Sequence, residues 1–595
     1  MKKIFKIIAV SIFVCQSLYA FVDRQDRDRE EMQNRLNELR VIKGVFLSGR
    51  TFIYLDPIWG NGNAFTNLAK KNDFNPLFNL YMNITAFPMP ALEIGTRLSL
   101  SMSQKVYYNL IADNLYAEFI ALQFILIRFG QISEKFTPFT LWSETDRVWL
   151  RSELFQMYQT EDLVYRLMDT DHSVPMQGIK IKFDLAMGED GLIRFKTFGA
   201  KILDESAQYN SYDRYLIGVM PGLSLFSDSI VLDGVYISCF DNTNSGSKDY
   251  NPPKKYEIAS VSGSINGSGF VPFFQNINLT GLGIEGEFAL SRHVEDLFLD
   301  NKPENGIAWK ANLFAKIEKM LDLKAGYRQI AYEFVSPGAQ TRFITPFVSG
   351  SIFRNAEYYD YLGLKPFYFM NTYRNRIQFT RDNNDLLNFT YSMNEATPNR
   401  EGLFGKLNVN LFDYVLLSVD ASKMNEVAPV ASPNKNLRDF LRIESEGSIK
   451  LNTIFDTSTL PKISGFYVLE NNNRDDDPLT TGSEKEDLVT SIIGAEILFD
   501  FKLVKIVGMY QRANLKGTKF IDVYDDKNQN ALTIEGYSPV SLDLVNTLIG
   551  GGAVIRISQN VNMQLDCMHM AYNDNKDAAS DYTFIQGRAI IVAKF

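Results

Sequence analysis

The sequence contains few of the residues on which most catalytic and metal sites depend: of its 595 residues, three are cysteine and three are histidine. Only Cys239 and Cys567 lie beyond residue 20, and their wide separation argues against a disulfide framework. After residue 20 there is also no run of about eighteen consecutive apolar residues, so we expect no membrane-spanning helix in the mature chain.

Basic residues are in the minority, with 61 Lys and Arg against 70 Asp and Glu, and the net charge is −9. The first residues, MKKIFKIIAVSIFVCQSLYAF, place three lysines before an apolar run and a small residue at Ala20. This pattern is typical of a secretory signal peptide, which we predict over residues 1–20. Its removal leaves a mature chain of net charge about −12, which argues against nucleic acid as a partner.

Short segments of alternating polarity recur along the whole chain. In QGIKIKFDLAM, residues 177–187, apolar side chains occupy one set of alternate positions and Lys180, Lys182 and Asp184 occupy the other. The same period of two appears in residues 91–102, 306–317 and 402–422. Such alternation predicts β-strands with one face toward lipid and the other toward water.

The connections between these segments alternate between short and long. Short ones occur at residues 87–91, 187–191, 317–321, 412–414, 499–502 and 558–562, and long polar ones at 240–255, 291–305, 470–487 and 572–581. Tight turns at one end and long loops at the other are typical of an outer-membrane barrel. The predicted fold is therefore all-β, a transmembrane antiparallel up-and-down β-barrel of about 22 to 24 strands over residues 41–595.

Residues 21–40 precede the first predicted strand and are dense in charge, with Met32, Leu36 and Leu39 spaced as on one helical stripe. We expect a short helix here, either in the periplasm or inside the lumen, and a solvated tail is the alternative. The 22-stranded TonB-dependent transporters resemble this chain only in barrel size, because they carry a long plug domain before the first strand. Energised uptake is therefore not expected.

The end of the chain, TFIQGRAIIVAKF, has Gln586 and Gly587 before alternating apolar residues and an aromatic at Phe595. It resembles the terminal strand signal of bacterial outer-membrane β-barrel proteins. The resemblance implies an outer-membrane location in a diderm bacterium, with the barrel-assembly machinery and outer-membrane lipids as partners. It also implies that Gly587 and Phe595 form the assembly signal and that the last strand closes the barrel against the first, near residues 41–55.

A barrel of this size encloses more volume than side chains can fill, so its lumen is aqueous, plugged or occupied by loops. Charged residues on the predicted inner face would then line a pore for small solutes, and the alternative is that they form cross-strand ion pairs that brace the wall. The predicted pore-lining residues are Glu93, Arg97, Lys180, Lys182, Asp184, Arg194, Lys196, Glu285, Glu287, Lys310, Lys316, Lys406, Arg442 and Glu444.

The longest early loop, residues 133–175, is unusually apolar for a segment in solvent. We predict that it folds into the barrel and narrows the pore, and a cap on the outer loops is the alternative. The predicted constriction residues are Trp142, Asp146, Arg147, Trp149 and Arg151.

No catalytic residue, metal ligand or cofactor is assigned. The available imidazoles are His172, His293, which we place in a polar loop, and His569, which alternates with apolar residues on the lipid face. The sequence thus favours a porin-like outer-membrane channel for passive passage of small polar solutes over an enzyme. The alternative is an occluded structural or adhesive barrel whose long loops bind partners.

Overall fold

The computed structural model describes residues 44–142, 174–339 and 395–594, apart from short gaps inside these ranges. The gaps are 56, 62–72, 75–76, 90, 104–107, 122–123, 188–189, 204–211, 246–252, 268–278, 295–296, 298–302, 430–434, 458–459, 478–484, 502, 525–533, 577 and 579–580. The predicted signal peptide, the predicted helix at 21–40 and Phe595 lie outside the described residues.

Nearly all of the regular structure is β. The strands are β1 (Gly44–Leu55), β2 (Pro57–Asn61), β3 (Asp73–Phe74), β4 (Leu77–Met89), β5 (Leu92–Ser103), β6 (Tyr108–Ala121), β7 (Ile125–Glu134), β8 (Val174–Met187), β9 (Gly191–Leu203), β10 (Arg214–Leu225), β11 (Ile230–Asp241), β12 (Lys255–Asn266), β13 (Leu279–Val294), β14 (Glu304–Ile317), β15 (Leu321–Ile330), β16 (Arg400–Leu411), β17 (Val415–Asn425), β18 (Asp439–Lys450), β19 (Lys462–Arg474), β20 (Glu486–Asp500), β21 (Val504–Tyr524), β22 (Ile534–Arg556), β23 (Val561–Asp574) and β24 (Tyr582–Lys594). A four-residue helix, α7 (Leu451–Ile454), lies in the turn between β18 and β19. In the part of the chain that the structure describes, no helix is long and apolar enough to cross a membrane.

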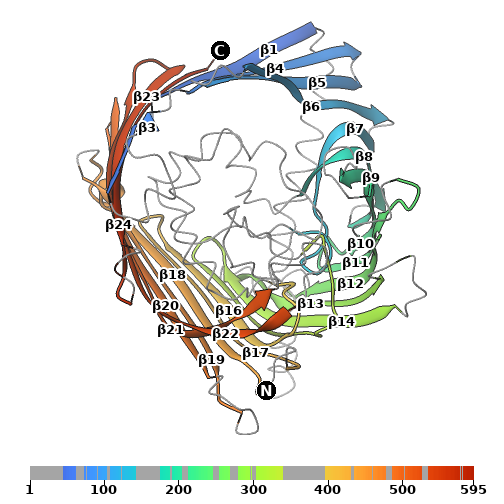
Figure 1. Cartoon of the computed structure of the whole chain (residues 1–595). Helices are drawn as coiled ribbons and strands as arrows, with labels where there is room; N and C mark the ends of the chain where they lie inside the picture. Colours follow the sequence, from blue (N-terminus) through green and yellow to red (C-terminus); the bar gives the residue numbers. More distant parts are fainter. Residues whose placement is uncertain are drawn as a thin grey trace.

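The strands form one closed antiparallel ring (Figure 1). Segments β1 and β2 both pair with β24, so together they act as one interrupted strand. Segment β4 pairs with β1 and β3 pairs with β2, so β3 and β4 likewise act as one interrupted strand. The 24 segments therefore make a barrel of 22 strands. The ring closes where β24 pairs with β1, from Arg50 opposite Lys594 to Leu55 opposite Ala589. This confirms the predicted fold class, the outer-membrane type of β-barrel and the closure of the last strand on the first.

Side chains along each strand alternate between the outer and inner faces of the wall, with the period of two that the sequence shows. On β14, Ile307 and Leu313 face outward and are 48% and 47% exposed, whereas Phe314 faces inward and is 5% exposed. Exposed Ile, Leu, Val, Phe and Tyr side chains recur in the same way on β10–β13 and β17–β23. This outward apolar surface would be unfavourable in water, and it matches the lipid-facing band of a membrane barrel.

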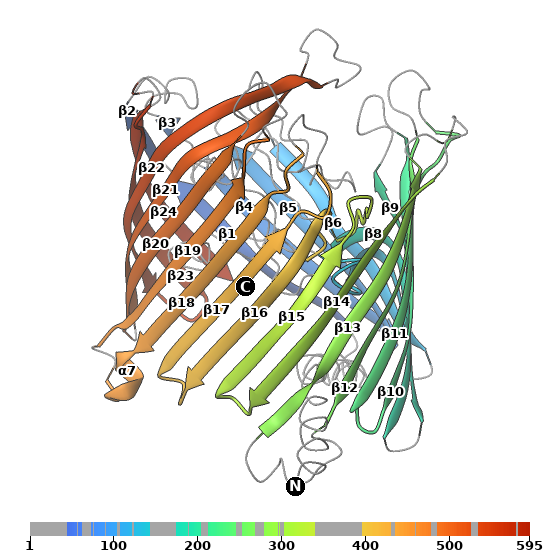
Figure 2. The ribbon, with the colours of Figure 1, turned by 90° about the horizontal axis from the view of Figure 1, so that it is seen from below.

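The two ends of the barrel differ as predicted. The strands run diagonally across the wall, and α7 and the short turns lie at one end (Figure 2). All six predicted short connections fall between strands that pair with each other. For example, β16 and β17 are joined by residues 412–414, where Phe412 and Asp413 adopt left-handed φ values of 52° and 62°. The Asn410 side chain stabilises this turn, because its Oδ1 accepts a hydrogen bond from the Asp413 amide at 2.9 Å.

An apolar cluster lies inside the ring against β7–β15. It joins inward-facing wall residues such as Ile132, Phe198 and Ile237 to buried residues of two connecting segments, including Phe139 and Phe334. These segments, residues 135–142 after β7 and 331–339 after β15, are hereafter the inward segments. They pack on the lumen side, because the opposite face of the same strands is the exposed apolar one.

Candidate functional site

The inner wall carries charged side chains that are mostly paired across neighbouring strands. Lys180 on β8 places Nζ 3.0 Å from Glu134 Oε2, and Lys196 on β9 places Nζ 3.9 Å from Glu134 Oε1. Further along, Arg194 Nη2 lies 3.1 Å from Asp233 Oδ1, and both side chains are buried. These pairs hold charge inside the wall that would otherwise be costly to bury.

Beside them, Glu287 on β13 and Lys310 on β14 anchor two connecting segments to the wall. Glu287 Oε1 accepts a hydrogen bond from the Phe139 amide at 3.3 Å, and Lys310 Nζ lies 3.7 Å from Glu287 Oε2. Lys310 also donates to Glu395 Oε2 at 2.5 Å and lies 5.3 Å from the centre of the Phe139 ring. One charge pair of the wall therefore contacts both the segment after β7 and the segment before β16.

Glu395 lies in the connection that precedes β16, and its carboxylate is close to several cationic side chains of the wall. Burial alone raises the pKa of Glu395, but the nearby cations Lys310, Lys324 and Arg328 outweigh burial and hold that pKa well below its usual range. Lys324 in turn pairs with Glu285, whose Oε1 also accepts a hydrogen bond from Asn312 Nδ2 at 2.5 Å. Glu395 is therefore ionised at neutral pH and stays bound to the wall.

The inward segments also bind each other. Ser336 Oγ donates to the carbonyl oxygen of Phe139 at 2.7 Å, and the Trp142 amide donates to the carbonyl oxygen of Gly338 at 2.9 Å. The rings of Phe139 and Phe334 meet edge to face with centroids 6.1 Å apart. The loop after β7 thus packs on the inner side of the wall over its described part, residues 135–142, and that it narrows a pore stays a prediction. Of the predicted constriction residues only Trp142 is described; Asp146, Arg147, Trp149 and Arg151 lie outside the described residues.

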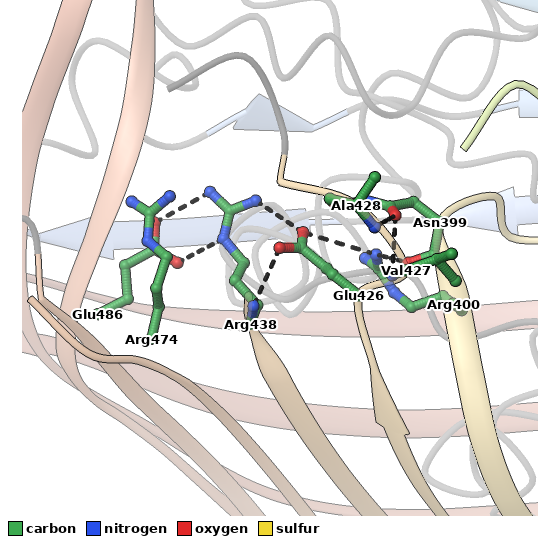
Figure 3. A network of polar contacts seen from close by, with 8 residues as sticks. All are labelled: Asn399, Arg400, Glu426, Val427, Ala428, Arg438, Arg474 and Glu486. Atoms are coloured by element: carbon green, nitrogen blue, oxygen red, sulfur yellow. Dashed lines mark hydrogen bonds and ion pairs between the residues drawn. The ribbon is translucent and has the colours of Figure 1, made fainter. Parts of the chain in front are cut away.

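A second network crosses the end of the wall that carries the long connections (Figure 3). Arg438, before β18, places Nη1 3.1 Å from Glu426 Oε1 and Nε 2.7 Å from Glu486 Oε2. Arg474 Nη2 lies 3.3 Å from Glu486 Oε1, and Arg400 Nη1 lies 3.8 Å from Glu426 Oε1. All five side chains are buried. We call these five residues the rim network, and they tie together the ends of β16 to β20.

Below the rim network, the inner wall of β17–β20 is rich in carboxylates. Arg442 Nη2 lies 2.6 Å from Glu444 Oε1 on the same strand, and Arg442 Nε lies 3.9 Å from Glu470 Oε1 on β19. Asp420, Glu446 and Glu496 occupy the same inward set of alternate positions. This stretch of wall, β17–β20 below the rim network, is the acidic arc.

The remaining predicted wall residues lie at inward positions in the strands. Glu93 Oε1 accepts a hydrogen bond from the Tyr116 hydroxyl at 2.5 Å, and Lys406 is opposite Lys324 and Asp420 in register. Lys182 and Asp184 are on β8, Lys316 is on β14, and Arg97 is placed by its backbone on β5. The ion pairs described above match the bracing alternative, and a role of these residues in lining a pore stays a prediction.

One of the histidines lies in a different element from the one predicted. His293 was expected in a polar loop, but it is the penultimate residue of β13, buried, with its ring stacked on Tyr256 and Nε2 3.1 Å from Glu304 Oε2. The strand continues past the apolar band, so its polar end resembles a loop in the sequence. His569 and Cys567 lie on the exposed outer face of β23, as predicted for His569, and Cys239 is buried on the inner face. His172 is outside the described residues.

Several charged groups of the inner wall were not predicted from the sequence: Glu134, Asp233, Glu395 and the rim network. Asp233 alternates with buried apolar residues on β11, and that pattern alone would have indicated an inward carboxylate. Glu395 and Glu426 lie outside the strands, where alternation gives no signal. Within the described ranges, no group of three His, Cys, Asp or Glu side chains is arranged to hold a metal ion.

No family model matches the chain, and no curated protein matches it. Solved structures with a similar course of the chain include the ferric citrate transporter FecA, at 10% identity and a TM-score of 0.44, covering 92% of this chain and 78% of that one. The translocation pore of the P pilus usher aligns at 8% identity and a TM-score of 0.37, covering 92% and 99%. The anion-selective porin of Comamonas acidovorans aligns at 9% identity and a TM-score of 0.26, covering 93% and 99%. Likenesses this weak carry no argument about function.

Proposed function

We propose that the protein is an outer-membrane, porin-like channel for the passive passage of small polar solutes. The observation that carries the proposal is the division of a closed 22-stranded wall into an apolar, exposed outer face and a charged inner face. An apolar band of this kind is stable only in contact with lipid, and ionised side chains are stable only beside water or counter-charges. The outer-membrane lipids and the barrel-assembly machinery remain predicted partners.

The inward segments would set the width of such a channel. Barrels of 16 to 18 strands already leave an aqueous channel, and a ring of 22 strands is wider. Residues 135–142 and 331–339 pack against β7–β15, so they occupy that side of the lumen. A solute path would therefore run along the remaining wall.

The same packing favours a second function, an occluded structural or adhesive surface barrel. Phe139, Leu141 and Phe334 are completely buried, as in the interior of a globular domain. If further chain fills the rest of the lumen equally tightly, the long connections at one end would be the functional surface.

Conductance of the full-length protein in planar lipid bilayers distinguishes the two functions. A channel is expected to give stepwise, steady single-channel currents, whereas an occluded barrel inserts without carrying current. A variant lacking residues 140–165 is expected to give a larger current, because part of the predicted constriction is removed. Protein unfolded by heat before addition is the control for leakage, and an absence of current from folded, inserted protein would contradict the channel.

A further inference from the structure

Several short connections at the turn end of the barrel carry a large, exposed apolar side chain. These side chains are 56% to 72% exposed, more than outward residues of the wall such as Ile307 and Leu313. We call them the apolar tips, and they are Phe226 between β10 and β11, Phe412 between β16 and β17, Phe455 after α7, Leu503 between β20 and β21, and Ile557 between β22 and β23. Large apolar side chains are unfavourable in water, and groups of them mark surfaces that bind lipid or protein.

Two of the apolar tips have a backbone conformation that favours other residue types. Phe226 has φ 55° and Phe412 has φ 52°, both in the left-handed region. Turns usually place Gly, Asn or Asp at such positions, because a bulky side chain is strained there. Since both phenylalanines are mostly exposed, packing within the protein does not offset this strain. A contact outside the protein would offset it.

Polar groups of the same turns are bound by side chains of the inner face. Asn410, at an inward position of β16, donates from Nδ2 to Asp413 Oδ1 at 2.8 Å. Arg556, at an inward position of β22, places Nη2 2.8 Å from Asp500 Oδ1, and its Nη1 donates to the carbonyl oxygen of Phe501 at 3.3 Å. These polar groups are therefore held toward the lumen, so the apolar tips can contact lipid without drawing them out of water.

The apolar outer face of the wall reaches these turns but stops short of the opposite end. Beside the turns, outward positions of β16–β23 hold Val409, Leu411, Val415, Leu417, Ile449, Ile463, Ile497, Ile506, Ile555 and Val561. Near the long connections, outward positions of β12–β21 include the charged residues Glu257, Arg292, Glu401, Lys423, Asp487 and Lys516. The apolar surface is therefore displaced toward the turn end and is continuous with the apolar tips.

From these observations we propose that the apolar tips form a membrane-binding ring that sits in the inner leaflet of the outer membrane, where phospholipid headgroups meet acyl chains. The turn end is then submerged to this depth, whereas the end with the long connections projects out of the membrane. The short turns of outer-membrane barrels face the periplasm, which assigns the inner leaflet. The inference rests on the proposed outer-membrane location and does not depend on whether the barrel conducts.

Fluorescent labels on single cysteines test the depth of the turn end. In a background with Cys567→Ser, the variants Phe412→Cys and Leu503→Cys are labelled with an environment-sensitive dye, and Cys239 is left in place because it is buried. The full-length protein is reconstituted into vesicles of phosphatidylethanolamine and phosphatidylglycerol. Phospholipids spin-labelled near the headgroup are expected to quench both labels, and iodide on both sides of the membrane is expected to quench them little.

Asp413→Cys is the matched control, because Asp413 is in the same turn as Phe412 and is bound by Asn410 of the inner face. Its label is expected to be quenched by iodide. Leu313→Cys, on the outer face of β14, is the lipid reference, and Asp475→Cys, exposed between β19 and β20, is the aqueous reference. Leu503→Cys keeps the test open if Phe412→Cys fails to fold.

Iodide quenching of the tip labels that equals that of the Asp475→Cys label overturns the lipid contact. Labels shielded from both quenchers overturn it as well, since protein would then cover the apolar tips. A Leu313→Cys label that spin-labelled phospholipids do not reach overturns the membrane location and this inference together. Inserted protein that carries no current overturns the channel function alone.

Discussion

At the scale of single residues, this wall depends on charges that are buried together. Arg438 contacts both carboxylates of the rim network, Glu426 and Glu486, and it also anchors its own backbone, since its amide donates to Glu426 Oε2 at 3.0 Å. Replacing such a residue with an apolar one leaves two carboxylates buried without their main counter-charge. The cost of breaking one buried pair in this way is about 3–5 kcal/mol.

Arg438→Met is therefore expected to lower the free energy of unfolding by about 3–5 kcal/mol, measured by urea titration of the barrel in detergent micelles. Arg292→Ala serves as the control, because Arg292 is exposed on the outer face and approaches Glu257 only to 4.0 Å. An exposed pair of this kind contributes about 0–1 kcal/mol. Equal losses in the two variants would show that the rim network does not stabilise the barrel.

At the scale of secondary structure, the strands of the wall were predictable from the sequence, whereas the segments that pack inside the barrel were not. Alternation placed Ile179 to Leu185 on β8 and located the turn at 412–414, because a half-buried strand and a tight turn are both local patterns. The burial of Phe139 in the lumen was one of two possibilities, because an apolar loop looks the same inside a barrel or under an outer cap. Glu395 could not be assigned at all, since its partner Lys310 is 85 residues away in the sequence.

The pairing of β6 with β7 depends on a glycine at the end of the paired stretch. Only Tyr116 to Ala121 of β6 pair with β7, and the last pair joins Tyr116 to Gly130. Gly130 has φ +91°, and a Cβ there would lie 2.1 Å from the Leu115 carbonyl oxygen. Gly130→Ala is therefore expected to destabilise the barrel by about 1–3 kcal/mol, because the backbone conformation is strained for any other residue and the neighbouring strand must move.

Gly199→Ala is the matched control for this substitution. Gly199 lies in the middle of β9, and a Cβ at that position meets no atom within 4 Å. The test is the urea concentration at the midpoint of unfolding, measured for the two variants and the parent protein in the same detergent. A decrease in Gly199→Ala as large as that in Gly130→Ala would refute the steric explanation.

At the scale of the whole molecule, a single seam turns an open sheet into a barrel. An open sheet of this length would leave the hydrogen-bonding groups of β1 and β24 unsatisfied, which is costly in lipid and promotes aggregation in water. The seam joins residues more than 500 positions apart, so it is also the least local contact of the fold. Its register is consequently a stringent test of the architecture.

Directly opposed residues of an antiparallel pair have Cα atoms about 4.5–5.5 Å apart, within the range that a disulfide spans. Thr51 is opposite Ala593 across the seam. In a background with Cys567→Ser, Thr51→Cys combined with Ala593→Cys is expected to form a disulfide under mild oxidation. The product should migrate faster on a denaturing gel and revert with reductant. Thr51→Cys with Ile591→Cys, two residues out of register, is expected to cross-link far less, and preferential cross-linking of this offset pair would show that the barrel closes in a different register.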